Sequence, residues 1–214
     1  MKPGDFYVGV ISFFAILVPG AVGAAVLEPL VGPLIFGPLI SAPADASTKW
    51  VVFLVAAYFI GHLIFLVGSY VDPVYGFLRS RLNPYTNESA YQCAVAIRDA
   101  IIDKRERQAL NAFQWSRAIL TALFPAAAGD VHGLEADSKF FRSLMVVFAL
   151  CGVVFLSQGK ILEGLAALVL VVPCFWRYYE RRLKSTTQAY VYLITLHRLG
   201  MVKRASPAGT LIED

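Results

Sequence analysis

The sequence predicts an all-α integral membrane protein with four transmembrane helices and a small helical cytoplasmic subdomain. The chain is 57% hydrophobic, has a mean hydropathy of +0.62 and contains 16% charged residues. An average soluble protein contains about 25% charged residues. The charged residues are also clustered, so that long apolar stretches contain none of them. Composition and clustering together exclude an ordinary soluble domain.

The apolar stretches have the length of membrane spans. The first two are uncharged runs of 22 residues, and about 20 residues of helix cross the hydrocarbon core. The last two form a predicted helical hairpin that turns at residues 157–160, and only Glu163 interrupts the fourth run. The four predicted spans are 6–27, 50–71, 143–159 and 161–176. The corresponding parts of the chain are an N-terminal membrane part (1–78), a cytoplasmic helical segment (79–139), a transmembrane hairpin (140–176) and a cytoplasmic C-terminal helix with its tail (177–214).

The basic residues predict the orientation of these spans. Of the 19 lysines and arginines, only Lys49 and Lys160 lie in the two loops that we place outside. Positive residues are enriched in cytoplasmic loops, so both termini and the central segment are expected in the cytoplasm of a cell with the chain in its inner membrane. The positive charge is then explained by topology and by anionic lipid headgroups, and no nucleic-acid partner is expected.

The first predicted span contains an irregular, small-residue stretch. Pro19 removes a backbone donor and is expected to kink the helix. Gly20, Gly23 and Ala24 follow, and Gly20 with Ala24 forms a small-xxx-small face that allows close helix contact. We expect this face to pack within the bundle or between subunits; a hinge or an ion-coordinating break is the alternative. A cleaved signal peptide is a second alternative, although 22 apolar residues exceed its usual apolar region.

The outer loop, residues 28–49, contains the apolar repeat GPLIFGPLI. Its prolines, among them Pro33 and Pro38, prevent an ordinary helix, and irregular backbone is not tolerated where it would face lipid. We expect the loop to cap the bundle at the outer leaflet. The alternative is a re-entrant loop around a subunit axis, with Glu28 near its mouth and Phe36 as its largest side chain.

The second predicted span contains the most informative polar side chain, His62. Ionisable groups at mid-membrane depth usually face a bundle interior or a cavity. Tyr58, His62 and Ser69 lie near one helical face. One structural hydrogen bond from His62 to a neighbouring helix is the simpler interpretation. A polar lining for protons, an ion or a lipid headgroup is the alternative.

The cytoplasmic segments are expected to be helical. We expect a helix after a cap at Asn87, a second over 106–123 that stops at Pro125, and a third that starts near Leu134 and continues into the third span. The fourth span should continue as a cytoplasmic helix over 177–199. Its stripe of Leu183, Tyr190 and Leu193 is fit to pack on another helix or to dock a cytosolic partner.

No catalytic or cofactor motif is present in the sequence. We find no Gly-rich phosphate loop, paired-cysteine site, HExxH or G-x-S-x-G. The group formed by Asp130, His132, Glu135 and Asp137 has metal-ligand chemistry, but a solvated helix start explains it more simply. We therefore predict no catalytic residue, no metal and no cofactor.

Three functions fit these features. The first is a homo-oligomeric pore or membrane-perturbing effector controlled by its cytoplasmic helices. The second is a non-conducting membrane anchor that docks a cytosolic protein. The third, and the weakest, is a membrane-embedded enzyme on lipid-linked substrates with His62 as base, because such chemistry needs several converging polar groups. The architecture resembles that of small bacterial membrane effectors of defence and stress systems, without a matched motif.

Overall fold

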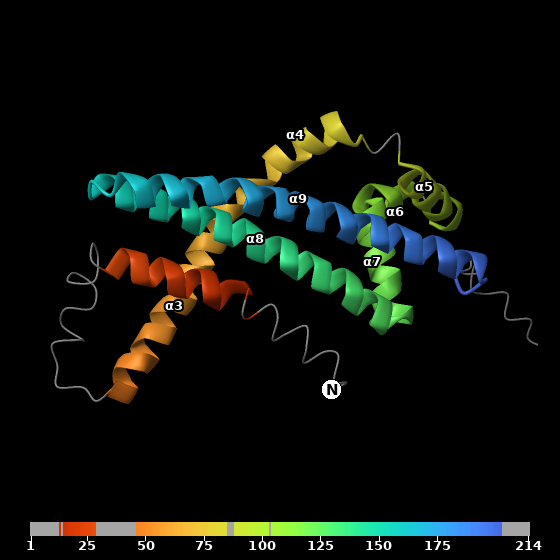
Figure 1. Ribbon diagram of the computed structural model, residues 1–214. Coiled ribbons are helices and arrows are strands. Elements are labelled where there is room, and N and C mark those ends of the chain that lie inside the picture. Colours follow the sequence, from red (N-terminus) through yellow and green to blue (C-terminus); the bar gives the residue numbers. More distant parts are fainter. Residues whose placement is uncertain (1–12, 14, 29–45, 85–87, 103, 203–214) are drawn as a thin grey trace, which may run out of the picture. The chain divides into compact units, whose positions relative to one another are not determined.

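The computed structural model describes residues 13, 15–28, 46–84, 88–102 and 104–202, and all regular structure in these ranges is α-helical (Figure 1). Three of the described helices are long and apolar enough to cross a membrane: Ser47–Leu82, Pro125–Ser157 and Ile161–Arg198. A shorter apolar helix covers Ala15–Glu28. The chain is therefore a helical protein with the features of an integral membrane protein.

Three of the predicted spans lie within long helices of the structure. The second lies mainly in α3 (Ala46–Ser69), the third in α8 (Pro125–Ser157) and the fourth in α9 (Ile161–Arg198). The first predicted span is described only from Ala15 onward, apart from Phe13, because residues 1–12 and 14 lie outside the described ranges. A fourth span therefore stays a prediction.

The chain divides into two compact units. We call Met1–Phe77 with His132–Arg182 the apolar unit, and Leu78–Val131 with Leu183–Asp214 the helical body. Helices α4 (Asp72–Leu82), α8 and α9 each contribute residues to both units. With 33 and 38 residues, α8 and α9 are about 50 and 57 Å long at 1.5 Å per residue. Each is longer than a hydrocarbon core of about 30 Å requires.

Helices α8 and α9 form the predicted hairpin in the apolar unit. Gly159 adopts a φ of 77° in the turn, a conformation that glycine reaches without steric cost. On the two sides of the turn, α8 and α9 approach each other closely at Gly152 and Gly164. A Cβ added to Gly152 would lie 2.6 Å from the side chain of Leu168, and one added to Gly164 would lie 2.7 Å from that of Leu156. Small residues of this kind allow helices to pack tightly in lipid.

The helical body has its own hydrophobic core. Helices α5 (Ser89–Ile101) and α7 (Ala112–Leu123) supply one part, and the ends of α8 and α9 supply most of the rest. The short helix α6 (Lys104–Ala109) lies between α5 and α7 in the sequence. The large buried residues at its centre are Trp115, Leu120, Val131, Tyr190 and Leu193. Burial of a large apolar side chain contributes on the order of 1.5–3 kcal/mol, so this core stabilises the helical body.

Two predicted helix boundaries are wrong. The segment 106–123 is not one helix, because α6 ends at Ala109 and a new helix, α7, begins after its N-cap Asn111. Its side chain accepts from the backbone N–H of Gln114 at 2.8 Å, and the Gln114 side chain accepts from the Asn111 N–H at 3.3 Å. Likewise α8 begins at Pro125 instead of near Leu134, because proline is tolerated in the first turn, where its missing N–H has no helical partner.

The predicted cap of α5 cannot be compared with the structure. Asn87 lies outside the described residues, and the residue before α5 is Glu88, whose side chain makes no capping hydrogen bond. Its carboxylate instead accepts hydrogen bonds from Arg79 and Thr187 in the helical body.

Candidate functional site

The polar face predicted on α3 is exposed. Val51, Val55, Tyr58, His62 and Leu66 follow one another at intervals of three or four residues, and all five are exposed. Residues spaced in this way share one face of a helix. We call these five residues the outer stripe.

His62 has one described neighbour of note in the outer stripe. Its ring packs edge-on against Tyr58, with 4.6 Å between ring centroids. No hydrogen bond to His62 occurs among the described residues, so the expected bond to a neighbouring helix of the same chain is not found in this part of the structure. Ser69 is half-buried and donates its hydroxyl to the carbonyl of Leu66 at 2.6 Å. The hydroxyl proton of Ser69 is therefore used within its own helix.

The small residues of the first helix lie against α3. A Cβ added to Gly20 would overlap the carbonyl of Ala57 and lie 2.7 Å from the backbone nitrogen of Gly61. A Cβ on Gly23 would lie 2.7 Å from the end of the Ile64 side chain. Ala24 is buried as well, and Pro19 is fully buried. This helix and α3 thus meet backbone to backbone, which only small residues permit.

The residues predicted in the outer loop are mostly outside the described ranges. Pro33, Phe36 and Pro38 fall within residues 29–45, of which the structure describes none. Glu28, the last residue of the first helix, is exposed. The lid and the re-entrant loop both remain predictions.

The predicted docking residues of α9 are in the core. Tyr190 and Leu193 are 2% and 0% exposed and pack inside the helical body. The 3–4 spacing was correctly read as a packing stripe, but the helices it contacts belong to the same chain. A docking role for these two side chains is therefore wrong, because a separate partner cannot reach them. Leu183 is only half-buried and lines a pocket.

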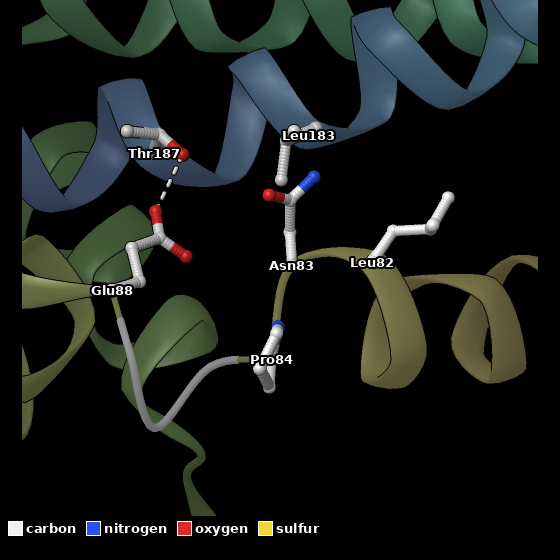
Figure 2. Close-up of a pocket in the computed structure, with 6 residues that line it drawn as sticks. All are labelled: Leu82, Asn83, Pro84, Glu88, Leu183 and Thr187. Carbon is white, nitrogen blue, oxygen red and sulfur yellow. Dashed lines mark hydrogen bonds between the residues drawn. The ribbon is translucent and has the colours of Figure 1, made fainter.

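That pocket has a volume of about 320 Å³ and lies within the helical body (Figure 2). Beside it, Glu88 connects two helices through its two carboxylate oxygens. Oε1 accepts the hydroxyl of Thr187 at 2.6 Å, and Oε2 accepts from Nη2 of Arg79 at 2.8 Å. Arg79 is 1% exposed and also donates to Thr186 at 3.3 Å. The lining residues are Leu82, Asn83, Pro84, Glu88, Leu183 and Thr187.

Sequence reasoning missed this buried ion pair. Arginine is almost never fully buried unless it is paired, and its partner Glu88 is only nine residues away. The hydrogen bonds to α9, however, join residues about one hundred positions apart. No local pattern in the sequence indicates such a contact.

A second polar cluster that sequence reasoning missed lies in the apolar unit. Nη1 of Arg142 donates to both oxygens of Asp72 at 2.9 Å, and the Tyr178 hydroxyl donates to Asp72 Oδ1 at 2.6 Å. The Arg142 guanidinium also lies 4.7 Å from the centroid of the Phe65 ring. The cluster joins α4, α8 and α9 just beyond the predicted second span, just before the third and just after the fourth. The feature of the sequence that could have indicated this cluster is the presence of charged residues at the ends of the predicted spans.

The acidic residues that were considered as metal ligands each contact a different partner. Asp130 accepts the hydroxyl of Tyr192 at 2.7 Å, and Glu135 lies 3.6 Å from the ring nitrogen Nδ1 of His132. Asp137 lies 3.5 Å from Arg181. Within the described residues, no group of three or more such side chains could hold a metal ion.

Comparison with protein-family models, curated proteins and solved structures found no match.

Proposed function

We propose that the chain assembles in the inner membrane as a homo-oligomeric pore or membrane-perturbing effector, controlled by its helical body on the cytoplasmic side. Bacterial defence and stress responses are the setting in which we expect such an effector. Both termini are cytoplasmic in this proposal, as the distribution of lysine and arginine indicates.

The observation that carries this proposal is the continuity of the long helices. Helices α4, α8 and α9 each contribute residues to the apolar unit and to the helical body. An anchor needs only a flexible tether between membrane and partner. A continuous helix, in contrast, transmits a shift at one end to its other end, and helix shifts are a common element of switching proteins. Continuity therefore favours control of the membrane part over simple anchoring.

The surface properties of the apolar unit are consistent with assembly. The outer stripe of α3 presents a histidine among apolar side chains, and ionisable groups in spans usually face another helix or a water-filled cavity. The burial of Tyr190 and Leu193 also removes two of the three side chains named for docking in the anchor alternative.

Purification in detergent followed by reconstitution tests the proposal. We expect a mass that is a multiple of 23.5 kDa and release of trapped ions from liposomes that contain the protein. A monomer that releases nothing would contradict the proposal.

A matched pair of variants at Lys184 tests the control by the body. Lys184 is exposed on α9, two residues beyond the boundary of the apolar unit. Lys184→Pro interrupts the helix at a cost of about 3 kcal/mol, whereas Lys184→Ala keeps it. We expect the proline variant alone to change ion flux while remaining inserted with the wild-type mass. Equal flux from both variants and the wild type would argue against control through α9.

A further inference from the structure

We propose that the outer stripe of α3 is a self-association surface, and that the same stripe of a second copy of this chain covers it. The proposal rests on the homo-oligomeric assembly proposed above and names its contact surface.

The chain's own described helices pack mainly on a different face of α3. Ala57, Gly61, Ile64 and Gly68 are buried, and Gly61 lies against the first helix while Gly68 lies against Arg142 of α8. At 100° per residue, the outer stripe lies roughly a third of a turn from this buried face. The first helical segment reaches the outer stripe at Tyr58, whose ring stacks on that of Phe13 with 6.1 Å between the ring centroids, and all five residues of the stripe remain exposed.

Lipid is an unsuitable neighbour for this open face. His62 is twelve residues from Trp50 and nine from Val71, which places it about 18 and 14 Å from the two ends of the predicted span. In a neutral imidazole one ring nitrogen donates a hydrogen bond and the other accepts one, and the hydrocarbon core offers a partner to neither. The occupant of this face must therefore supply polar groups at the depth of His62.

A second copy supplies those groups at the right depth. In a two-fold pair of chains with the same orientation, each residue of the stripe meets its own counterpart. The two His62 rings then lie beside both Tyr58 hydroxyls, so that ring nitrogens and hydroxyls can serve one another as donors and acceptors. Val51, Val55 and Leu66 add apolar contacts at the 3–4 spacing of a helix–helix seam. From Val51 to Leu66 the seam is about 22 Å long.

Disulfide cross-linking of single cysteines tests this surface. In a background with Cys93→Ser, Cys151→Ala and Cys174→Ala, the test variants are Val55→Cys and Leu66→Cys. The controls are Leu63→Cys and Val67→Cys, which are exposed on the same helix at similar depth but are turned roughly 100° or more from His62. Oxidation in membranes should give disulfide-linked dimers for the test variants and few for the controls. Equal yields, or higher yields for the controls, would overturn the proposal and assign the stripe to lipid or to another part of the same chain.

A second pair of variants tests the role of the imidazole. In the Val55→Cys background, His62→Ala should lower dimer formation about fivefold, since an interhelical hydrogen bond in a membrane contributes roughly 1 kcal/mol. His62→Gln, which keeps a donor and an acceptor, should retain most of it. Equal dimer formation by both variants would overturn the role assigned to His62.

The outcomes separate this inference from the proposed function. Cross-linking through the stripe without ion flux would refute the pore and leave the interface standing. Ion flux from an oligomer without cross-linking through the stripe would refute the interface and leave the pore standing.

Discussion

Replacement of Glu88 by glutamine tests how the helical body is held together. Arg79 is 1% exposed, and the Glu88 carboxylate accepts from its guanidinium at 2.8 Å and from the Thr187 hydroxyl at 2.6 Å. Glu88→Gln preserves the shape of the side chain and removes the negative charge that faces Arg79. The variant leaves a buried positive charge without its compensating carboxylate.

The expected loss follows from the burial of the two partners. Breaking a buried ion pair from one side costs about 3–5 kcal/mol. The Glu88 side chain is 21% exposed, and partial screening by solvent reduces the loss to roughly 2–3 kcal/mol. Thr187→Val removes only the neutral hydroxyl and should cost about 1 kcal/mol. The double variant Arg79→Met with Glu88→Gln should be less destabilised than the sum of the single variants, because no unpaired charge remains.

Tryptophan fluorescence during denaturant unfolding in detergent measures these losses. Trp115 is 4% exposed in the core of the helical body, whereas Trp50 and Trp176 are exposed. Replacing the two exposed residues by phenylalanine leaves a reporter that follows the body alone. The midpoint and slope of the transition give the free energy of unfolding. If Glu88→Gln unfolds within about 0.5 kcal/mol of the parent, or if the double variant loses the full sum, the ion pair does not hold the body together as argued.

Three further predictions concern the membrane part. Gly20→Ile should destabilise the protein by about 1–3 kcal/mol or more in thermal unfolding, because the added side chain meets the backbone of α3, whereas Ala25→Ile on the exposed side of the same helix should be tolerated. A cysteine at Ser47 should react with an impermeant thiol reagent added outside intact cells while one at Ser206 should not, and the reverse pattern would overturn the orientation. Phe36→Ser should change conductance in reconstituted liposomes if the outer loop lines a pore, whereas lower stability with unchanged flux would assign the loop to a lid.

The secondary structure of the apolar helices was largely predictable, because length and the absence of charge are local properties. Helices α3, α8 and α9 contain most of the second, third and fourth predicted runs, and the hairpin turns where predicted. Helix boundaries outside these runs were less predictable. A capping box at Asn111 starts α7 inside the segment that was expected to be one helix. Helix α7 ends at Leu123 as predicted, but α8 begins at Pro125 instead of near Leu134. An asparagine can lie within a helix or cap its start, and a proline can follow one helix or begin the next. The conformation of the neighbouring backbone decides which of these roles each residue has.

The candidate sites were predicted unevenly for a related reason. The spacing of Tyr190 and Leu193 indicated a packing face, but whether its neighbour is the same chain or a partner depends on segments distant in sequence. The Gly20 face was recognised from its small residues, whereas its contact with Ala57 and Gly61 required the structure. The clusters around Arg79 and Arg142 were missed because their partners come from several helices.

The sequence by itself determined that this protein is helical and has the apolar segments of a membrane protein, because hydrophobicity and its period act over one helix at a time. Only the tertiary structure decided which face of each helix is covered. On α3 the glycine face is buried and the His62 face is exposed, and on α9 the predicted docking residues Tyr190 and Leu193 lie in the core of the helical body. Burial is a property of the folded chain, since it depends on which helices meet. Contacts between residues about one hundred positions apart leave no periodic signal in the sequence.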